Sequence, residues 1–244
     1  MTTLTGRVAL VTGAGKRVGR AIALALGQCG MRVAVHYNAS ADGARETAKL
    51  IESAGGVATL AQADLRDVAA CERMIDTIVS ELGELHTLVN SAAEMVRTPI
   101  GEVTQAEWDN MFALNVRAPF FLSQRAAPHL RAVGGSIVNI ADLAAFETWI
   151  GYVPHGMTKA AVVQMTRALA HALAPEVRVN GIAPGVVLLP EDFDEASAEH
   201  LRRTTPLQRL GTPEDVAQAV VYLLQAEYVT GEVICVDGGR HVRR

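Results

Sequence analysis

The chain of 244 residues is half hydrophobic and one fifth charged, and it contains 21 glycines. This composition excludes collagen-like, disordered and disulfide-rich proteins and indicates one large hydrophobic core. The formal net charge of −4 disfavours a general nucleic-acid-binding surface, so we expect a small-molecule partner and no nucleic acid. No linker-like stretch interrupts the apolar pattern, and residues 1–244 are therefore interpreted as a single domain.

Cysteine usage and hydropathy bear on where the protein works. Cys29, Cys71 and Cys235 are widely spaced in apolar stretches, where inert buried thiols are favoured over a disulfide or a metal site. The chain start lacks a basic-then-apolar signal pattern, and the longest uncharged run, Val179 to Pro190, is shorter than the roughly 20 residues of a membrane helix. These features predict a cytoplasmic protein with no metal and no membrane segment.

Short β-rich segments alternate with longer segments of helical period. The first, Arg7–Thr12, is apolar and β-branched enough for a strand buried on both faces. Six more strands are predicted over Met31–Tyr37, Val57–Gln62, Leu85–Asn90, Ser136–Ile140, Arg178–Ile182 and Glu232–Val236. Helices are predicted over Ala21–Cys29, Ala41–Ala54, Val68–Leu82, Thr104–Arg131 and Ala160–Ala174, and another begins at Pro213. Such strands pair in parallel through right-handed crossovers, so we expect an α/β fold of the Rossmann type, a doubly wound parallel sheet of about seven strands with helices on both faces.

A glycine-rich turn, Gly13 to Gly19, joins the first strand to the first helix. Glycines at this junction permit a sharp turn, a close approach of the backbone to a pyrophosphate and tight packing of helix on strand, with the helix N-terminus facing the anion. The position of the turn therefore predicts a dinucleotide site contacted by Gly13, Val18 and Gly19. A purely structural turn is the alternative.

The end of the second strand indicates which dinucleotide is bound. Residues 36–40 are His, Tyr, Asn, Ala and Ser, with no Asp or Glu that would bind the ribose hydroxyls of NAD. His36, Asn38 and Ser40 can donate to a 2′-phosphate, and Arg17 lies in the neighbouring turn, so the sequence favours NADPH (NADP) over NADH. A surface histidine without a ligand is the alternative for His36.

Beyond these local patterns, the sequence resembles the short-chain dehydrogenase/reductase family over nearly its whole length. The likeness is carried by the cofactor turn Thr12–Gly19, the adenine-holding pair Asp64–Leu65, the segment Asn90–Ala92, the asparagine Asn115, the pair Pro184–Gly185 and the strand ending Val236–Gly239. The resemblance implies an oxidoreductase whose cofactor is contacted by Asp64, Leu65, Asn90, Pro184 and Gly185. It also implies a homotetramer assembled through two long helices, near residues 104–131 and 154–174.

Two departures from the family pattern resemble pteridine reductases and bacterial dihydromonapterin reductases. Arg17 stands at the second glycine position of the turn, and Asp142 stands where most members carry serine. The resemblance implies that Arg17 lies near the pyrophosphate and the substrate and that Asp142 belongs to the proton-transfer chain. A turn cap just after a strand is the alternative for Asp142.

The Tyr-x-x-x-Lys motif of the family is replaced by the segment 155–159, in which His155 stands for the proton-donating tyrosine. His155 and Lys159 lie four residues apart on a predicted helix and therefore share one face. An imidazole can act as a general acid near neutral pH. The resemblance implies that Lys159 contacts the ribose hydroxyls of the cofactor and that Asn115 completes the catalytic set.

Three routes for the proton remain open. His155 can donate it directly or through a water, Asp142 can donate it with a water, or Tyr152 can swing in from just upstream. Pro154 predicts a helix start that leaves Tyr152 outside the helix, which weakens the last route.

The segment from Gly185 to Thr205 is expected to cover the substrate as a mobile lid, and a solvated acidic loop is a compatible alternative. It contains five acids, Glu191, Asp192, Asp194, Glu195 and Glu199. Glu94 aligns with the residue that stacks on the pterin ring in the pteridine-reductase branch, and Leu189 aligns with a threonine at the carboxamide. The substrate contacts expected are Arg17, Glu94, Tyr152 and Leu189. The acidic character favours a polar or cationic substrate.

The sequence therefore predicts an NADPH-dependent reductase of a C=N or C=O bond in a small polar ring, pterin-like or a cyclic imine. An NADP(H)-binding sensor or interaction protein without turnover is one alternative, although the matching spacing of Asn115, Asp142 and Lys159 favours an enzyme. A reductase of carrier-linked ketone or enoyl groups is another. It predicts a basic patch for an acidic carrier, and the acidic lid argues against that.

Overall fold

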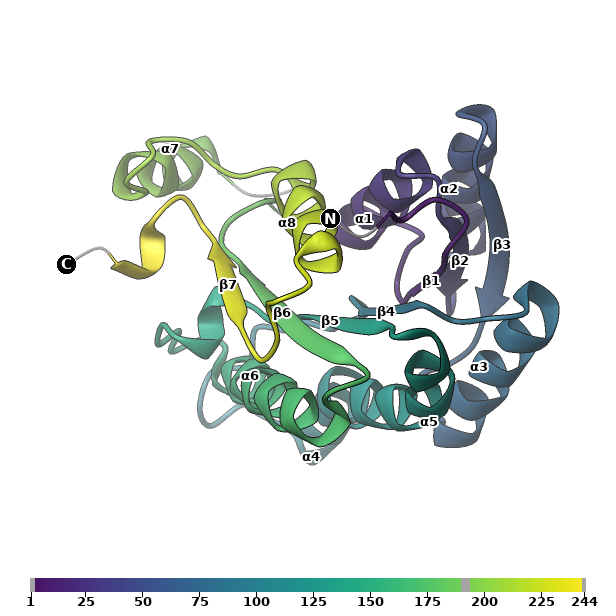
Figure 1. Cartoon of the computed structure of the whole chain (residues 1–244). Helices are drawn as coiled ribbons and strands as arrows, with labels where there is room; N and C mark the ends of the chain where they lie inside the picture. The colour runs from purple at the N-terminus through teal and green to yellow at the C-terminus, as the bar shows by residue number, and fades with distance from the viewer. Residues whose placement is uncertain (1–2, 190–193, 243–244) are drawn as a thin grey trace.

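The computed structural model describes residues 3–189 and 194–242, and its strands form one seven-stranded parallel sheet (Figure 1). The strands are β1 (Val8–Val11), β2 (Arg32–Tyr37), β3 (Val57–Gln62), β4 (Thr87–Asn90), β5 (Ser136–Ile140), β6 (Arg178–Pro184) and β7 (Val233–Val236). Their order in the sheet is β3-β2-β1-β4-β5-β6-β7. The order runs outward from β1 and β4 in both directions, which confirms the predicted doubly wound sheet.

Helices cover both faces of the sheet, as expected. The helices are α1 (Arg17–Gln28), α2 (Ala41–Ser53), α3 (Val68–Leu82), α4 (Gln105–Phe112), α5 (Ala118–Val133), α6 (Val153–Leu173), α7 (Glu195–Thr204) and α8 (Pro213–Gln225), with the short turns η1 (Ala113–Arg117), η2 (Leu143–Ala145) and η3 (Arg240–Val242). Helices α1, α2 and α8 pack on one face, and α3, α5 and α6 pack on the other (Figure 1). Within the described ranges, no helix is both long and apolar enough to span a membrane.

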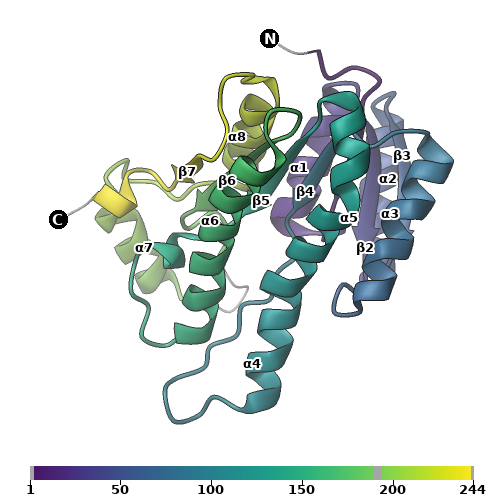
Figure 2. The ribbon, with the colours of Figure 1, turned by 60° about the horizontal axis from the view of Figure 1, so that its bottom comes forward.

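The helix predicted over Thr104–Arg131 is interrupted. Helices α4 and α5 are joined end to end by η1, a turn of π-helix (Figure 2). Pro119 lies in the first turn of α5 and has no N–H, so the α-helical bond to the carbonyl of Asn115 cannot form, and the wider π turn accommodates the gap. Apolar periodicity misses such a turn because the helix continues on both sides of it. The π turn buries the side chain of Asn115.

Helix α6 begins earlier than the predicted Ala160. It starts at Val153, with Tyr152 at its N-cap and Pro154 in its first turn, where a missing N–H leaves no helical bond unmade. The expectation that Pro154 opens the helix and leaves Tyr152 outside it is confirmed. The earlier start places both His155 and Lys159 on the helix.

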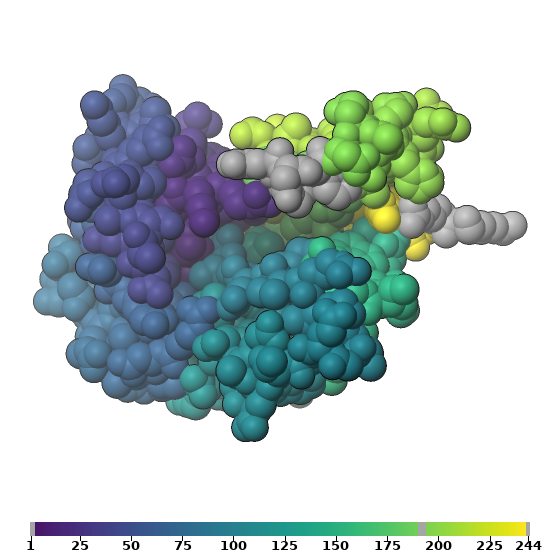
Figure 3. Space-filling view, turned by 180° about the vertical axis from the view of Figure 1, so that it is seen from behind, coloured from purple at the N-terminus to yellow at the C-terminus, as the bar shows by residue number. Residues whose placement is uncertain are grey.

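One side of the molecule is hollowed. Seen from behind in Figure 3, the hollow lies between the N-terminal part in purple, the teal segment around α4 and the green α7. Helix α7 belongs to the segment predicted as a lid, and it borders this hollow.

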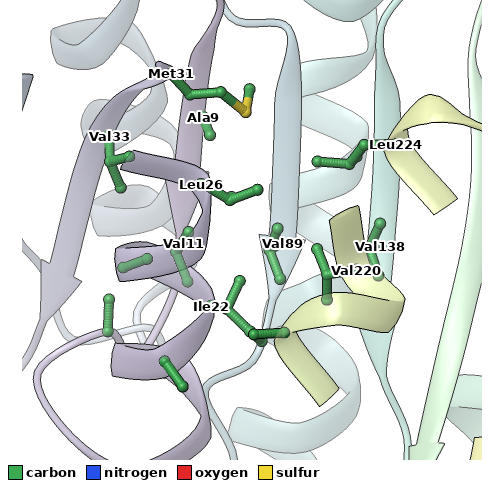
Figure 4. Packing of buried hydrophobic residues seen from close by; sticks show 14 of the residues in the cluster. Ala9, Val11, Ile22, Leu26, Met31, Val33, Val89, Val138, Val220 and Leu224 are labelled. Atoms are coloured by element: carbon green, nitrogen blue, oxygen red, sulfur yellow. The ribbon is translucent and has the colours of Figure 1, made fainter. Parts of the chain in front are cut away.

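The core explains why the strands are apolar on both sides. In β1, Ala9 and Val11 face α1 and α8, whereas Val8 and Leu10 face the opposite layer with α3 and α5. Figure 4 shows Ile22 of α1 lying among core side chains from the sheet and from α8. Burying an aliphatic side chain of this size stabilises the fold by roughly 2 kcal/mol. This packing fixes α1 on the sheet, so the N-terminus of the helix is held at the end of β1.

Candidate active site

The turn between β1 and α1 approaches the end of β4 closely. Thr12 Oγ1 accepts hydrogen bonds from the backbone N–H groups of Ser91 (2.9 Å) and Ala92 (3.0 Å). Gly13 has a φ of +66°, and a Cβ there would lie 3.0 Å from Ala92 Cα. A Cβ at Gly19 would collide with the carbonyl oxygen of Gly13. Both glycines are therefore required by the close approach of backbone to backbone, as the predicted turn demands.

Arg17 begins α1 in a left-handed conformation, with a φ of +53°. A residue with a Cβ adopts this conformation at a cost of about 1 kcal/mol. Its side chain is exposed, and in the described ranges no hydrogen bond or ion pair holds its guanidinium. Arg17 thus combines a strained backbone conformation with a guanidinium that has no partner in the described ranges. Such a combination indicates a residue that contacts a ligand.

A cavity of about 270 Å³ opens beside this turn. Its lining includes the predicted residues Gly13, Arg17, Val18, Gly19, His36, Asn38, Asp64 and Leu65. It also includes Lys16, Ser91 and Ala92, which lie in the family-like segments Thr12–Gly19 and Asn90–Ala92, and Ala93 and Leu114, which were not predicted. The short side chain of Ala93 after β4 was an available signal, because small residues permit a close approach to a ligand.

His36 lines the cavity, but its ring is not free to bind a phosphate. The side chain is almost fully buried, Nδ1 accepts a hydrogen bond from the backbone N–H of Gly13 (2.9 Å), and Nε2 lies 3.1 Å from the carbonyl oxygen of Ala63. Burial lowers the pKa of His36 to about 4, so the ring is neutral at ordinary pH with its proton on Nε2. The expected donation from His36 to a 2′-phosphate does not fit this arrangement. The ring supports the cofactor turn instead.

Five other predicted cofactor residues lie outside the cavity lining, namely Ser40, Asn90, Lys159, Pro184 and Gly185. The side-chain amide of Asn90 lies over the neighbouring strand β5, where its Nδ2 donates to Asn139 Oδ1 (2.8 Å). Ser40 stands at the N-cap of α2. A Cβ at Gly185 would lie 2.7 Å from the Cβ of Asp237, so this glycine lets the ends of β6 and β7 approach each other. Their contacts with a cofactor remain predictions.

Lys159 is enclosed at the carboxyl end of β5. Its side chain is almost fully buried, and Nζ donates to the carbonyl oxygen of Ile140 (3.0 Å). Burial lowers the pKa of Lys159 to about 8, and the carboxylate of Asp142 partly opposes this effect. The ammonium group of Lys159 therefore loses its proton at a pH closer to neutrality than that of an exposed lysine.

Asp142 lies two residues after the end of β5, and its two carboxylate oxygens have different neighbours. Oδ1 caps the η2 turn by accepting from the N–H of Ala144 (2.7 Å), so the cap considered from the sequence is present. Oδ2 lies 3.7 Å from Nε2 of His155. The side chain of Asp142 is 23% exposed, whereas that of His155 is 2% exposed. Of the two groups, only the carboxylate reaches the surface.

The second ring nitrogen of His155, Nδ1, also has a neighbour within the protein. Nδ1 lies 3.3 Å from the carbonyl oxygen of Glu94, and the enclosed Nε2 has no hydrogen-bond partner. The separation between Nε2 and Asp142 is too long for a hydrogen bond but suits an ion pair when the ring is protonated. A substrate cannot touch Nε2 without a rearrangement, so direct donation from His155 does not fit this conformation.

Asn115 connects this pair to the end of β4. Its Oδ1 accepts from the backbone N–H of Glu94 (2.8 Å), and its Nδ2 donates to the carbonyl oxygen of the same residue (2.8 Å). Nδ2 also donates to Thr158 Oγ1 (3.1 Å), which in turn donates to the carbonyl oxygen of His155 (2.7 Å). The sequence analysis did not single out Thr158, since a threonine within a helix carries no distinct signal.

The carboxylate of Glu94 has a partner within the protein, and its expected substrate contact remains a prediction. It forms an ion pair of 2.7 Å with Arg66, which follows the adenine-side residue Leu65. The cause is the convergence of the loops after β3 and β4 at the same edge of the sheet. Glu94 contributes its backbone to the His155 cluster and its side chain to the loop after β3.

The two remaining substrate candidates are Tyr152, at the N-cap of α6, and Leu189, within the segment predicted as a lid. Tyr152 is partly buried, and its ring contacts the edge of Trp149 at a centroid distance of 6.3 Å. Leu189 is partly buried at the end of the first described range. Neither position tests the expected substrate contact.

The expected lid is described except for residues 190–193. Glu191 and Asp192 therefore lie outside the described residues. Arg202 pairs with Glu195 (2.7 Å) and Glu199 (3.1 Å), so part of the acidic charge is balanced within α7. This pairing weakens the inference of a cationic substrate from the acidity of the lid.

Comparison with known proteins identifies the family. Residues 13–241 match the family profile described as enoyl-(acyl carrier protein) reductase. A ketoacyl reductase of the granaticin polyketide synthase of Streptomyces violaceoruber is 37% identical over 243 residues, covering 96% of each chain. The chain belongs to the short-chain dehydrogenase/reductase family. The structure of a short-chain dehydrogenase/reductase from Serratia marcescens has a TM-score of 0.93 and 35% identity, over 98% of this chain and 100% of that chain.

This short-chain dehydrogenase/reductase is therefore an oxidoreductase of a family that uses a nicotinamide cofactor. A further relative, 3β-hydroxysteroid dehydrogenase 1 of Eggerthella lenta, is 34% identical over 245 residues, covering 97% of this chain and 94% of the relative. The site fits such a cofactor, because Gly13 and Gly19 line the cavity without side chains and the exposed guanidinium of Arg17 borders it. In the part of the chain that the structure describes, no group of three or more His, Cys, Asp or Glu side chains could hold a metal ion.

Proposed function

We propose that this protein is an NADPH-dependent reductase that adds a hydride to a C=N or C=O bond of a small polar cyclic substrate, pterin-like or a cyclic imine. The observation that carries the proposal is the pairing of a partly exposed Asp142 with a buried His155 (3.7 Å) beside the buried Lys159. This pair occupies the positions at which the family carries serine and tyrosine. It offers a proton source that does not depend on a phenol.

The preference for NADPH rests on charge. The end of β2 carries no carboxylate, and Asn38 borders the cavity. Lys16 and Arg17 are exposed at the same cavity. Two cations and an amide favour a 2′-phosphate, which a carboxylate at this place would repel. His36 does not contribute to this preference, because both of its ring nitrogens are engaged within the protein.

The proton reaches the substrate through Asp142 rather than directly from His155. When bound, the reduced nicotinamide supplies a hydride to the substrate carbon, and the π electrons of the double bond move to the nitrogen or oxygen. The imidazolium of His155 passes its proton to the carboxylate of Asp142, and the carboxylic acid so formed donates this proton to the substrate atom, which leaves a carboxylate and a neutral imidazole. Nε2 is enclosed while the carboxyl group is accessible, and the relay requires the two groups to close from 3.7 Å to hydrogen-bond distance.

Lys159 supports the same centre with its charge. Its ammonium group is oriented by the carbonyl of Ile140 and lies near enough to Asp142 to interact with its charge. We infer that it binds the ribose hydroxyls of the cofactor, as the family resemblance implies. We also infer assembly as a homotetramer through α4, α5 and α6, which include the two helical stretches named from the sequence.

A reductase of carrier-linked ketones is the second candidate. The family profile and the granaticin relative favour it, since their descriptions name an acyl carrier protein and a ketoacyl substrate. The partial pairing of the lid acids with Arg202 removes some of the charge that argued against an acidic carrier. The two candidates differ in substrate and not in the proton path.

A cofactor and substrate screen tests the proposal. Oxidation of NADPH is followed with dihydropterins, cyclic imines, activated cyclic ketones and a ketoacyl thioester, and binding of NADPH and NADH is titrated separately. We expect tighter binding of NADPH and fastest turnover with a polar cyclic substrate. Preference for the thioester favours the second candidate, and tight binding of NADPH with no turnover of any substrate supports a sensor or interaction protein instead.

A further inference from the structure

The proton path proposed above, on which this inference rests, requires Nε2 of His155 to be the nitrogen that gains and loses the proton. A neutral imidazole carries one N–H and one lone pair, and the hydrogen bond made by one nitrogen decides which nitrogen holds the proton. The surroundings of the ring therefore select the tautomer.

The partner of Nδ1 is the carbonyl oxygen of Glu94, at 3.3 Å. A carbonyl oxygen only accepts, so a hydrogen bond exists there only when Nδ1 carries the proton. Nε2 faces the carboxylate of Asp142 at 3.7 Å and has no hydrogen-bond partner. Asp142 alone would favour a proton on Nε2, so the two neighbours of the neutral ring compete.

The Glu94 carbonyl is fixed by Asn115. The amide of Asn115 pairs with both the N–H and the C=O of Glu94, each at 2.8 Å, which sets the plane of that backbone segment. The second N–H of the amide donates to Thr158 Oγ1 (3.1 Å), and this hydroxyl donates to the carbonyl of His155 (2.7 Å). The amide thus uses its oxygen and both hydrogens, which also determines its orientation.

We propose that Asn115 is a positioning residue that acts through the backbone of Glu94 to hold neutral His155 in its Nδ1–H form. In this arrangement Nδ1 keeps its proton throughout the cycle. Nε2 carries a proton in the imidazolium, releases it towards Asp142, and presents its lone pair to receive the next one. The side chains of Asn115, His155 and Thr158 are buried, so water does not compete for these hydrogen bonds.

The chain provides a matched control for this set of contacts. Asn139 Nδ2 donates to Thr166 Oγ1 (2.9 Å), and this hydroxyl donates to the carbonyl of Val162 (2.8 Å) in the same helix α6. Asn115 and Thr158 form the equivalent pair beside His155. Thr166→Val therefore removes a buried hydroxyl of the same kind without touching the Glu94 carbonyl.

The test is the tautomer of His155, measured by long-range ¹H–¹⁵N correlation spectroscopy on the ¹⁵N-labelled full chain, at a pH where the ¹⁵N shifts of His155 show a neutral ring. The signals are assigned by their loss in His155→Gln. We expect the wild-type protein and Thr166→Val to show a protonated Nδ1 and an unprotonated Nε2. Asn115→Ala and the milder Thr158→Val are expected to shift the population towards the Nε2–H form.

An Nε2–H tautomer in the wild-type protein overturns the inference. So does a pattern in which Asn115→Ala and Thr158→Val both fold and both retain the wild-type tautomer. The measurement needs neither cofactor nor substrate, so it is independent of the reductase proposal. The expected tautomer together with no NADPH oxidation contradicts the proposed function alone, whereas turnover with the opposite tautomer contradicts this inference alone.

Discussion

We expect acid to destabilise this protein through His36. The ring is buried and neutral in the folded chain, with a pKa of about 4 set mainly by burial, and in the unfolded chain it titrates at the ordinary value of 6.5. As the pH falls from about 7 to about 4, the unfolded chain takes up a proton that the folded chain does not accept. The stabilising contribution is therefore complete above 6.5 and is lost as the pH falls towards 4.

The magnitude follows from the two pKa values. Each pKa unit corresponds to 1.36 kcal/mol, so the free energy of unfolding should fall by about 3 kcal/mol on account of His36. His86 adds to the same trend, since burial also lowers its pKa. The comparison between the wild-type protein and a variant isolates His36, because the other titrating groups are common to both.

Urea unfolding at a series of pH values provides the assay. His36→Asn should be less stable than wild type near neutral pH by roughly 1–3 kcal/mol, because the Gly13 N–H loses its buried acceptor. As the pH falls from 7 to 4, the difference should move by about 3 kcal/mol in favour of the variant, so the two stabilities converge or reverse their order. The exposed His171, replaced in the same way, serves as the control for the loss of an imidazole from the surface.

Parallel stability curves for wild type and His36→Asn would refute the reasoning. They would mean that the His36 ring takes up its proton at similar pH in the folded and unfolded chains. The same result would reopen a direct contact between His36 and a phosphate, which its engaged nitrogens now argue against.

Three further predictions concern the cofactor turn and the core. Arg17→Gly should raise the free energy of unfolding by up to about 1 kcal/mol, because glycine adopts the left-handed backbone conformation without strain. The same variant should bind NADPH at least about tenfold more weakly. A gain in both stability and affinity would contradict the role of the guanidinium. Gly19→Ala should abolish dinucleotide binding in a calorimetric titration, because the added Cβ collides with the Gly13 carbonyl oxygen. Wild-type affinity in this variant would show that the turn does not hold the cofactor. Leu26→Ala should lower the free energy of unfolding in urea by roughly 2–5 kcal/mol, because Leu26 is fully buried. The control Leu60→Ala, at an exposed leucine, should lower it by less than about 0.5 kcal/mol. Equal losses would contradict the core assignment.

The fold could be predicted because its signals are local. Strands such as β1 are apolar on both faces, and glycines stand where β1 meets α1, so element type and order follow from short windows of sequence. The π turn at η1 was not predictable in this way. It adds one wider turn between two stretches that keep the same helical character, and periodicity alone does not register it.

The candidate site was only partly predictable because its contacts join distant segments. Lys159 and His155 share a helix face, and their spacing shows this directly. The ion pair between Glu94 and Arg66 depends on two loops that meet only in the folded sheet. His36 lies at the end of a strand buried on both faces, so alternation along the strand could not show that its ring turns towards Gly13.

The central claim is that Asp142 and His155 together replace the missing tyrosine as the proton source. The most direct measurement is the rate of NADPH oxidation with the best cyclic substrate for Asp142→Ala, His155→Gln and the control Tyr228→Phe at an exposed ring, with NADPH affinity titrated for each. We expect kcat to fall by about 10²–10⁴ for the first two variants at unchanged NADPH affinity, and to stay within about twofold for the control. Near-wild-type turnover by Asp142→Ala or His155→Gln would contradict the account.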